Sequence, residues 1–165
     1  MSLISFFKEA GEKLFGHTEA AASAAAPDPA AAQAKADEMN KAAGAAIEKY
    51  IASQGLSAQG LDVAFDGASA TVTVSGQAAD QATREKIVLC CGNVNGVNKV
   101  NDMMTVSAPA DESQYHLVER GDTLSKIAKQ YYGNANDYPK IFEANKPMLS
   151  NPDKIYPGQL LRIPK

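Results

Sequence analysis

The pattern of hydrophobic and polar positions predicts a helix followed by two strands in the first half of the chain. Apolar residues at helical spacing over 39–51 form a stripe of Met39, Ala43, Ala46, Ile47, Tyr50 and Ile51. Two runs that alternate apolar and polar residues follow at 61–65 and 70–74. Between them stands Asp66-Gly67, which is typical of a β-hairpin with a loop of two residues or more.

A second helix and a third strand follow this hairpin. Residues 78–91 have a helical pattern with an apolar inner face, and Gly92 ends the helix. Apolar positions between residues 97 and 106 then predict a strand. The order helix–strand–strand–helix–strand predicts a domain over residues 37–106, with a small sheet and helices packed on one face.

Residues 114–165 carry the pattern of a second small domain. Short apolar strands are predicted at 115–118 and 160–163, and helices at 124–131 and 136–145. The order strand–helix–helix–strand again mixes both kinds of element. The chain is therefore predicted to be an α+β protein of two small α/β-layer domains.

Capping residues support the helices of the second domain. Asp122 or Thr123 is placed to cap the first helix, and Gly133 is placed to end it. Pro147 ends the second helix, because its ring cannot continue a helical backbone.

The segments outside these domains differ in composition. Residues 1–16 predict a short amphipathic helix on Leu3, Phe6, Phe7, Ala10 and Leu14. Its polar face balances Lys and Glu, which favours docking against the protein over binding to an anionic membrane. Residues 17–36, rich in alanine with two prolines, predict a linker or partly helical spacer, and residues 107–113 a polar hinge.

Charge and hydropathy narrow the classes of function. The formal net charge is −3 and no basic stripe is present, so nucleic acid is not expected as a partner. No apolar stretch approaches the length of a membrane span, and the N-terminus lacks the pattern of a secretory signal. We expect a cytoplasmic monomer.

The sequence contains no group of residues that would make a candidate catalytic site. Cys90 and Cys91 are adjacent, which disfavours a disulfide, and we expect them to be small apolar residues on a packed helix. His17 lies in the predicted linker, and His116 is expected to be a surface or edge-strand residue without a catalytic partner. Without a nucleophile–base pair or metal ligands, a binding protein is predicted rather than an enzyme.

Several motifs of the second domain closely resemble those of a LysM domain. They are Gly-Asp-Thr-Leu at 121–124, Asn-Lys-Pro at 145–147, Ile-Tyr-Pro-Gly-Gln at 155–159 and Leu-Arg-Ile-Pro at 161–164. The resemblance implies a βααβ fold and a groove for glycans that contain N-acetylglucosamine, such as peptidoglycan or chitin. The residues implied in that groove are Gly121, Asp122, Thr123, Leu124, Asn145, Lys146, Pro147 and Met148.

The first domain is similar to a BON domain, which implies an αββαβ order. The similarity lies in Val-Ser-Gly at 74–76 and Asn-Val-Asn-Gly-Val at 93–97. With the LysM motifs behind it, nearly the whole chain resembles a family of cytoplasmic bacterial potassium-binding proteins, including the tracts 6–14 and 142–149. The alanine-rich insertion after Gly16 is longer than the spacer usual in that family.

The family resemblance implies a potassium site made of main-chain carbonyl oxygens. Proteins select this large, weakly hydrated ion with carbonyls, and unpaired carbonyls occur at helix C-termini and glycine-rich turns. The implied ligands come from the N-terminal segment and from the loop after the second helix: Phe7, Lys8, Ala10, Gly92, Val94 and Val97. Binding of K⁺ would then close the two domains on each other.

Two other functions stay open on the sequence. The LysM motifs favour binding of peptidoglycan or another glycan, and an interaction scaffold or envelope-stress protein would need only the two domains.

Overall fold

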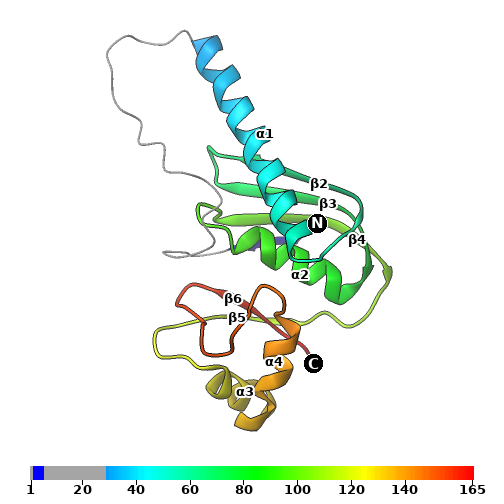
Figure 1. Ribbon diagram of the computed structural model, residues 1–165, viewed down its shortest axis with the longest axis vertical. Coiled ribbons are helices and arrows are strands. Elements are labelled where there is room, and N and C mark those ends of the chain that lie inside the picture. Colours follow the sequence, from blue (N-terminus) through cyan, green and yellow to red (C-terminus); the bar gives the residue numbers. More distant parts are fainter. Residues whose placement is uncertain (1, 6–28) are drawn as a thin grey trace.

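The computed structural model describes residues 2–5 and 29–165, which form two units in contact (Figure 1). The N-terminal unit comprises residues 2–5 and 29–108, and the C-terminal unit residues 114–164. Each contains helices and strands, which confirms the predicted α+β class.

The N-terminal unit has the predicted helix–strand–strand–helix–strand order. It contains α1 (Pro29–Ser53), β2 (Gln59–Asp66), β3 (Thr71–Asp80), α2 (Gln81–Gly92) and β4 (Lys99–Ala108). Strands β2 and β3 are antiparallel, whereas β3 and β4 are parallel and α2 crosses between them. Figure 1 shows both helices on one face of the sheet.

Apolar side chains from helices and strands form the core of this unit. It contains Ile47 and Ile51 of α1, Val63 of β2, Val72 and Val74 of β3, Ile87 and Leu89 of α2, and Val100 of β4. The alternate positions along β3 are only half-buried. This is the period-two pattern of a sheet with one covered face.

Residues 2–5 correct the prediction of an N-terminal helix. They form β1 (Ser2–Ser5), which pairs antiparallel with β4 and extends the sheet to the order β1-β4-β3-β2. Main-chain hydrogen bonding to the outer edge of β4 outweighs the helical spacing of the apolar residues. The rest of the predicted helix, residues 6–16, lies outside the described residues.

Helix α1 begins earlier than the apolar stripe at 39–51. It starts at Pro29, so residues 29–36 of the predicted linker or partly helical spacer are helical. Proline suits the first position of a helix because it has no N–H to satisfy. Met39, assigned to the apolar stripe, is 52% exposed, and the buried positions begin at Ala43. The first part of α1 therefore projects beyond the sheet (Figure 1).

The C-terminal unit has the predicted strand–helix–helix–strand order. It contains β5 (Gln114–Leu117), α3 (Leu124–Tyr132), the 3₁₀ turn η1 (Ala135–Asp137), α4 (Tyr138–Ala144) and β6 (Leu160–Ile163). Of the two candidate caps Thr123 caps α3, accepting from the Lys126 N–H at 3.2 Å. Gly133 ends α3 at φ 77°, as the left-handed C-cap position requires.

The two units dock through α2 and β6. Leu160 of β6 belongs to the core cluster of the N-terminal unit, and Met148 packs against that cluster. The predicted hinge at 107–113 is shorter than expected, because Ser107 belongs to β4 and Ser113 is buried with its N–H bonded to Glu85.

Gly44 allows α1 to approach β2 closely, and this contact can be tested. A Cβ at Gly44 would overlap the main-chain carbonyl of Val63. We expect Gly44→Ala to lower the free energy of unfolding by about 2 kcal/mol in urea denaturation, although alanine favours helix. The exposed control Ala45→Gly should cost only about 1 kcal/mol. A stabilised Gly44→Ala protein would contradict the close packing.

Candidate functional site

The loop that follows α2 packs its apolar side chains into the core of the N-terminal unit. Val94 and Val97 are fully buried, and Gly96 has φ 91°, a conformation that favours glycine. Asn93 is the C-cap of α2 and donates its N–H to the Leu89 carbonyl at 2.8 Å. The N–H of Val97 donates to the Val94 carbonyl at 3.2 Å.

This loop carries half of the expected potassium ligands. Gly92 is the last residue of α2, and Val94 and Val97 lie in the loop itself. The other three, Phe7, Lys8 and Ala10, lie outside the described residues. Strand β1 ends beside the loop, because Ser5 pairs with Lys99 at the start of β4.

The side chain of Asn93 ties this loop to the C-terminal unit. Its Nδ2 donates to the Leu160 carbonyl at 3.1 Å, and its Oδ1 accepts from the Leu160 N–H at 3.3 Å. Nδ2 also lies 3.1 Å from Met148 Sδ. The sequence predicted a potassium site at the main-chain carbonyls on either side of Asn93, but it did not predict these contacts of the Asn93 side chain.

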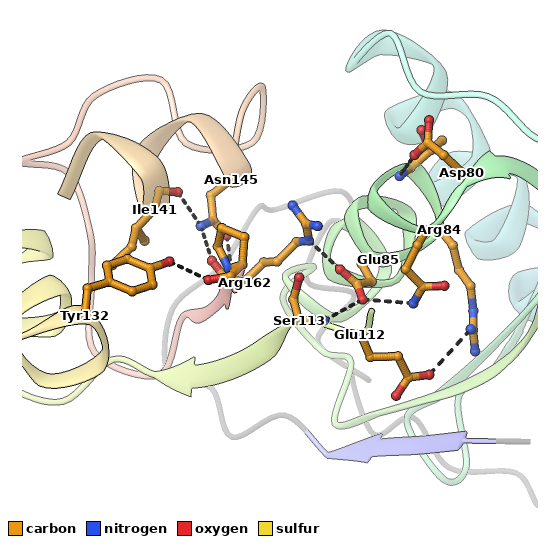
Figure 2. A network of polar contacts seen from close by, with 12 residues as sticks. Asp80, Arg84, Glu85, Glu112, Ser113, Tyr132, Ile141, Asn145 and Arg162 are labelled. Atoms are coloured by element: carbon orange, nitrogen blue, oxygen red, sulfur yellow. Dashed lines mark hydrogen bonds and ion pairs between the residues drawn. The ribbon is translucent and has the colours of Figure 1, made fainter. Parts of the chain in front are cut away.

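Glu85 and Arg162 form a buried ion pair at the same interface (Figure 2). Arg162 Nε donates to Glu85 Oε2, while Glu85 Oε1 accepts from Gln81 Nε2 and from the Ser113 N–H, each at 2.9 Å. Burial raises the pKa of Glu85, but the hydrogen bonds from Arg162, Gln81 and Ser113 outweigh it and leave the pKa below its ordinary value. The carboxylate therefore stays ionised inside the interface.

Arg84, next to Glu85 on α2, ties β4 to the connection between the units. It forms an ion pair with Asp102 at 2.9 Å. A longer pair joins it to the exposed Glu112 at 3.8 Å (Figure 2). Asp102 also accepts the Met104 N–H at 2.9 Å.

The first loop of the implied glycan groove is largely engaged within the C-terminal unit. Leu124 is buried in the core of the unit, and Thr123 caps α3. The Gly121 carbonyl accepts from Lys126 Nζ at 2.7 Å, and Asp122 accepts from the Glu119 N–H at 2.9 Å.

The second loop lies at the junction between the units. Asn145 is buried and bonds the main chain of Arg162, and Met148 packs on the N-terminal unit. Lys146 pairs with Glu143 at 2.6 Å, and Pro147 is exposed. A cavity beside Met148 has a volume of about 80 Å³, well below the 300 Å³ or more of usual ligand pockets.

His116 lies on β5 of the two-stranded sheet, the edge-strand position that was one of the two expectations, and its side chain has polar partners. Its Nε2 lies 2.9 Å from Asp122 Oδ2, and its Nδ1 lies 3.3 Å from the Tyr131 hydroxyl. Burial raises the pKa of Asp122, but the Glu119 N–H and His116 outweigh burial and lower it. The three side chains link β5 to α3, a contact that sequence spacing does not reveal.

The cysteines behave as the sequence predicts. Cys90 and Cys91 are free and buried on α2, and burial raises the pKa of Cys90 to about 12. Within residues 2–5 and 29–165, no group of three or more His, Cys, Asp or Glu side chains could hold a metal ion. None of the described helices is long and apolar enough to cross a membrane.

Substitution of Glu85 tests the buried ion pair. Glu85→Gln leaves Arg162 without its counter-ion, so we expect the free energy of unfolding at pH 7 to fall by roughly 3 kcal/mol. Because the folded-state pKa is lowered, the stabilisation is present above the ordinary carboxyl pKa and is lost as pH falls through the folded-state value. Glu85→Gln should therefore flatten the acid side of the stability profile.

The matched control is Glu112→Gln, which removes the exposed partner of Arg84. We expect a change below about 1 kcal/mol in urea titrations between pH 3 and 7. Equal effects of the two variants would argue against a special role of the buried pair.

Comparison with known proteins places both units in described families. The BON domain model matches residues 40–108, and the LysM domain model matches residues 116–164. Both are binding rather than catalytic domains.

A similar protein along the whole chain is the potassium binding protein Kbp of Escherichia coli O6:H1. It is 42% identical over 166 aligned positions, which cover 100% of this chain and 99% of that protein. Shorter matches of 49 residues, 30% of this chain, occur in other bacteria. An uncharacterized protein of Deinococcus radiodurans is 55% identical over 19% of its length, and the spore coat assembly protein ExsA of Bacillus cereus 45% over 7%. The chain therefore belongs to the family of the potassium binding protein Kbp, with a BON domain followed by a LysM domain.

Proposed function

We propose that this protein binds a potassium ion through main-chain carbonyl oxygens of the loop after α2. The observation that carries the proposal is the whole-length similarity to a protein named for potassium binding. The loop suits the ion, because a helix C-terminus and a glycine turn leave carbonyls without helical partners. Carbonyl oxygens are also the groups with which proteins select potassium.

The proposed ligands are the carbonyls of Phe7, Lys8 and Ala10 together with those of Gly92, Val94 and Val97. Ser5 pairs with Lys99, so the chain leaves β1 beside the loop. Each further residue extends a chain by at most about 3.6 Å, which allows residues 7–10 to reach the loop carbonyls. Covalent geometry therefore supports a site shared by the two segments.

Such a site would be insensitive to the side chains of its ligands. Val94 and Val97 belong to the apolar core cluster, so their side chains contact the core and only their carbonyl oxygens could coordinate an ion. A carbonyl ligand at Lys8 likewise leaves its ammonium group without a role in coordination.

We also propose that the ion stabilises the docked arrangement of the two units. A ligand that binds only one state shifts the population towards it, by about 2.7 kcal/mol at 100 times the dissociation constant. This free energy is enough to shift two folded units towards the docked state. It is far below the conformational-entropy cost of folding an unfolded domain.

Glycan binding by the C-terminal unit receives less support from the described side chains. The side chains of Leu124 and Asn145 are buried, and Met148 faces the N-terminal unit. A sugar ring that stacked on Met148 would need the units to separate, and Leu124 lies in the core of its own unit.

Calorimetry on the full chain tests ion binding. We expect K⁺ to give a saturable heat that equal concentrations of Na⁺, Li⁺ and Ca²⁺ do not give, and Lys8→Ala to retain it. Deletion of residues 1–11 should abolish it, because it removes half of the ligands. That deletion also removes β1, so its melting curve in sodium buffer must show a folded protein.

Three results would count against the proposal. Equal responses to K⁺ and Na⁺ would remove selectivity, and potassium binding by the folded truncated protein would place the site elsewhere. Heat from an N-acetylglucosamine oligomer, with none from potassium, would favour glycan binding.

A pair of glycine substitutions tests the loop itself. Gly96 and Gly133 have φ of 91° and 77°, and a Cβ at either would meet open space. Alanine at each site should cost about 1 kcal/mol of stability through backbone strain alone. Only Gly96→Ala should weaken potassium binding in calorimetry, because it displaces the Val94 and Val97 carbonyls; an equal loss in Gly133→Ala would refute a local effect.

A further inference from the structure

Asn93 stands at the point where the proposed ion loop meets the C-terminal unit. It lies between Gly92 and Val94, two of the proposed carbonyl ligands, and it is only 2% exposed. Its amide bonds both the N–H and the carbonyl of Leu160. A change in the position of Leu160 is therefore transmitted directly to the loop.

The outer edge of β6 shows why this contact is specific. On its inner edge β6 pairs antiparallel with β5, which leaves the N–H and carbonyl groups of Leu160 and Arg162 on the other edge. Asn145 bonds both main-chain groups of Arg162 at 2.8 Å, from within the same unit. Asn93 does the same for Leu160, but from the N-terminal unit.

Separation of the units would break both hydrogen bonds at once and expose these groups to water. The Asn93 amide would then lose the partner that fixes its orientation, since both groups are buried only in the docked arrangement. The loop conformation and the docking of β6 therefore form together. The Glu85–Arg162 ion pair fixes β6 to α2 at a second point, away from the loop.

We infer that Asn93 is a positioning residue through which docking of the C-terminal unit arranges the loop carbonyls for the ion. This inference rests on the proposed potassium binding. The C-terminal unit supplies no ligand, yet it sets the ion affinity by holding the loop in shape. Because coupling between two equilibria is reciprocal, the ion strengthens docking by the same factor through the same side chain.

Potassium calorimetry on three full-chain variants tests the coupling. Asn93→Ala should weaken potassium binding by about tenfold, within the range usual for coupled sites. Glu85→Gln should weaken it in the same direction, because it loosens docking without touching the loop. The control is Asn134→Ala, which removes an asparagine cap of η1 in the C-terminal unit and should leave the affinity within about twofold of the unchanged chain.

Amide hydrogen exchange in sodium buffer gives a readout that does not need the ion. In Asn93→Ala the N–H groups of Val97 and Leu160 should exchange faster, while that of Ile127 in α3 stays protected. Faster exchange only near Asn93 supports its role in holding the loop. Uniformly faster exchange would indicate general destabilisation and would contradict it.

The two hypotheses fail in different ways. If Asn93→Ala melts at a lower temperature but binds potassium within twofold of the unchanged chain, the positioning role is overturned while the proposed function stands. If the unchanged chain itself gives no potassium heat, the proposed function is wrong, and so is the proposed effect of Asn93 on potassium affinity. The exchange data then still decide whether Asn93 holds the loop.

Discussion

Strand β6 is held against helix α2 by polar contacts at two points, and the arrangement of both units depends on them. Asn93 binds the main chain of Leu160, and Glu85 binds the side chain of Arg162. Both contacts are buried, so each partner has lost its water and needs the other. Apolar packing of Leu160 brings the surfaces together, while the polar contacts determine which residue of β6 faces which part of α2.

Helix α2 therefore contacts the core of the N-terminal unit, the loop that follows the helix, the segment between the units and the C-terminal unit. Its apolar face completes the core of the N-terminal unit, and its C-terminal end leads into the loop with the candidate carbonyls. Glu85 and Arg84 connect it to the C-terminal unit and to the segment between the units. One helix therefore contacts the loop, the segment between the units and the C-terminal unit.

The sequence predicted what local patterns determine. Alternation at 61–65 and 70–74 gave the hairpin, and Gly133 marked the end of α3. Strand β1 was missed because four residues become a strand only through pairing with β4. The burial of Glu85 was also missed, because a glutamate on a helix predicts a solvent-facing position. Its carboxylate is buried because Arg162, 77 residues away, neutralises it and because Gln81 and Ser113 donate hydrogen bonds to it.

The pairing of β1 also bears on the behaviour of the protein at high concentration. An uncovered strand edge offers free N–H and carbonyl groups to other chains and is a common start of aggregation. Strand β4 has ten residues, and β1 covers those from Lys99 to Asp102. Removal or displacement of the first residues, for example by a bulky N-terminal fusion, would expose this edge while leaving the core in place. Its first consequence would be self-association of intact molecules rather than unfolding.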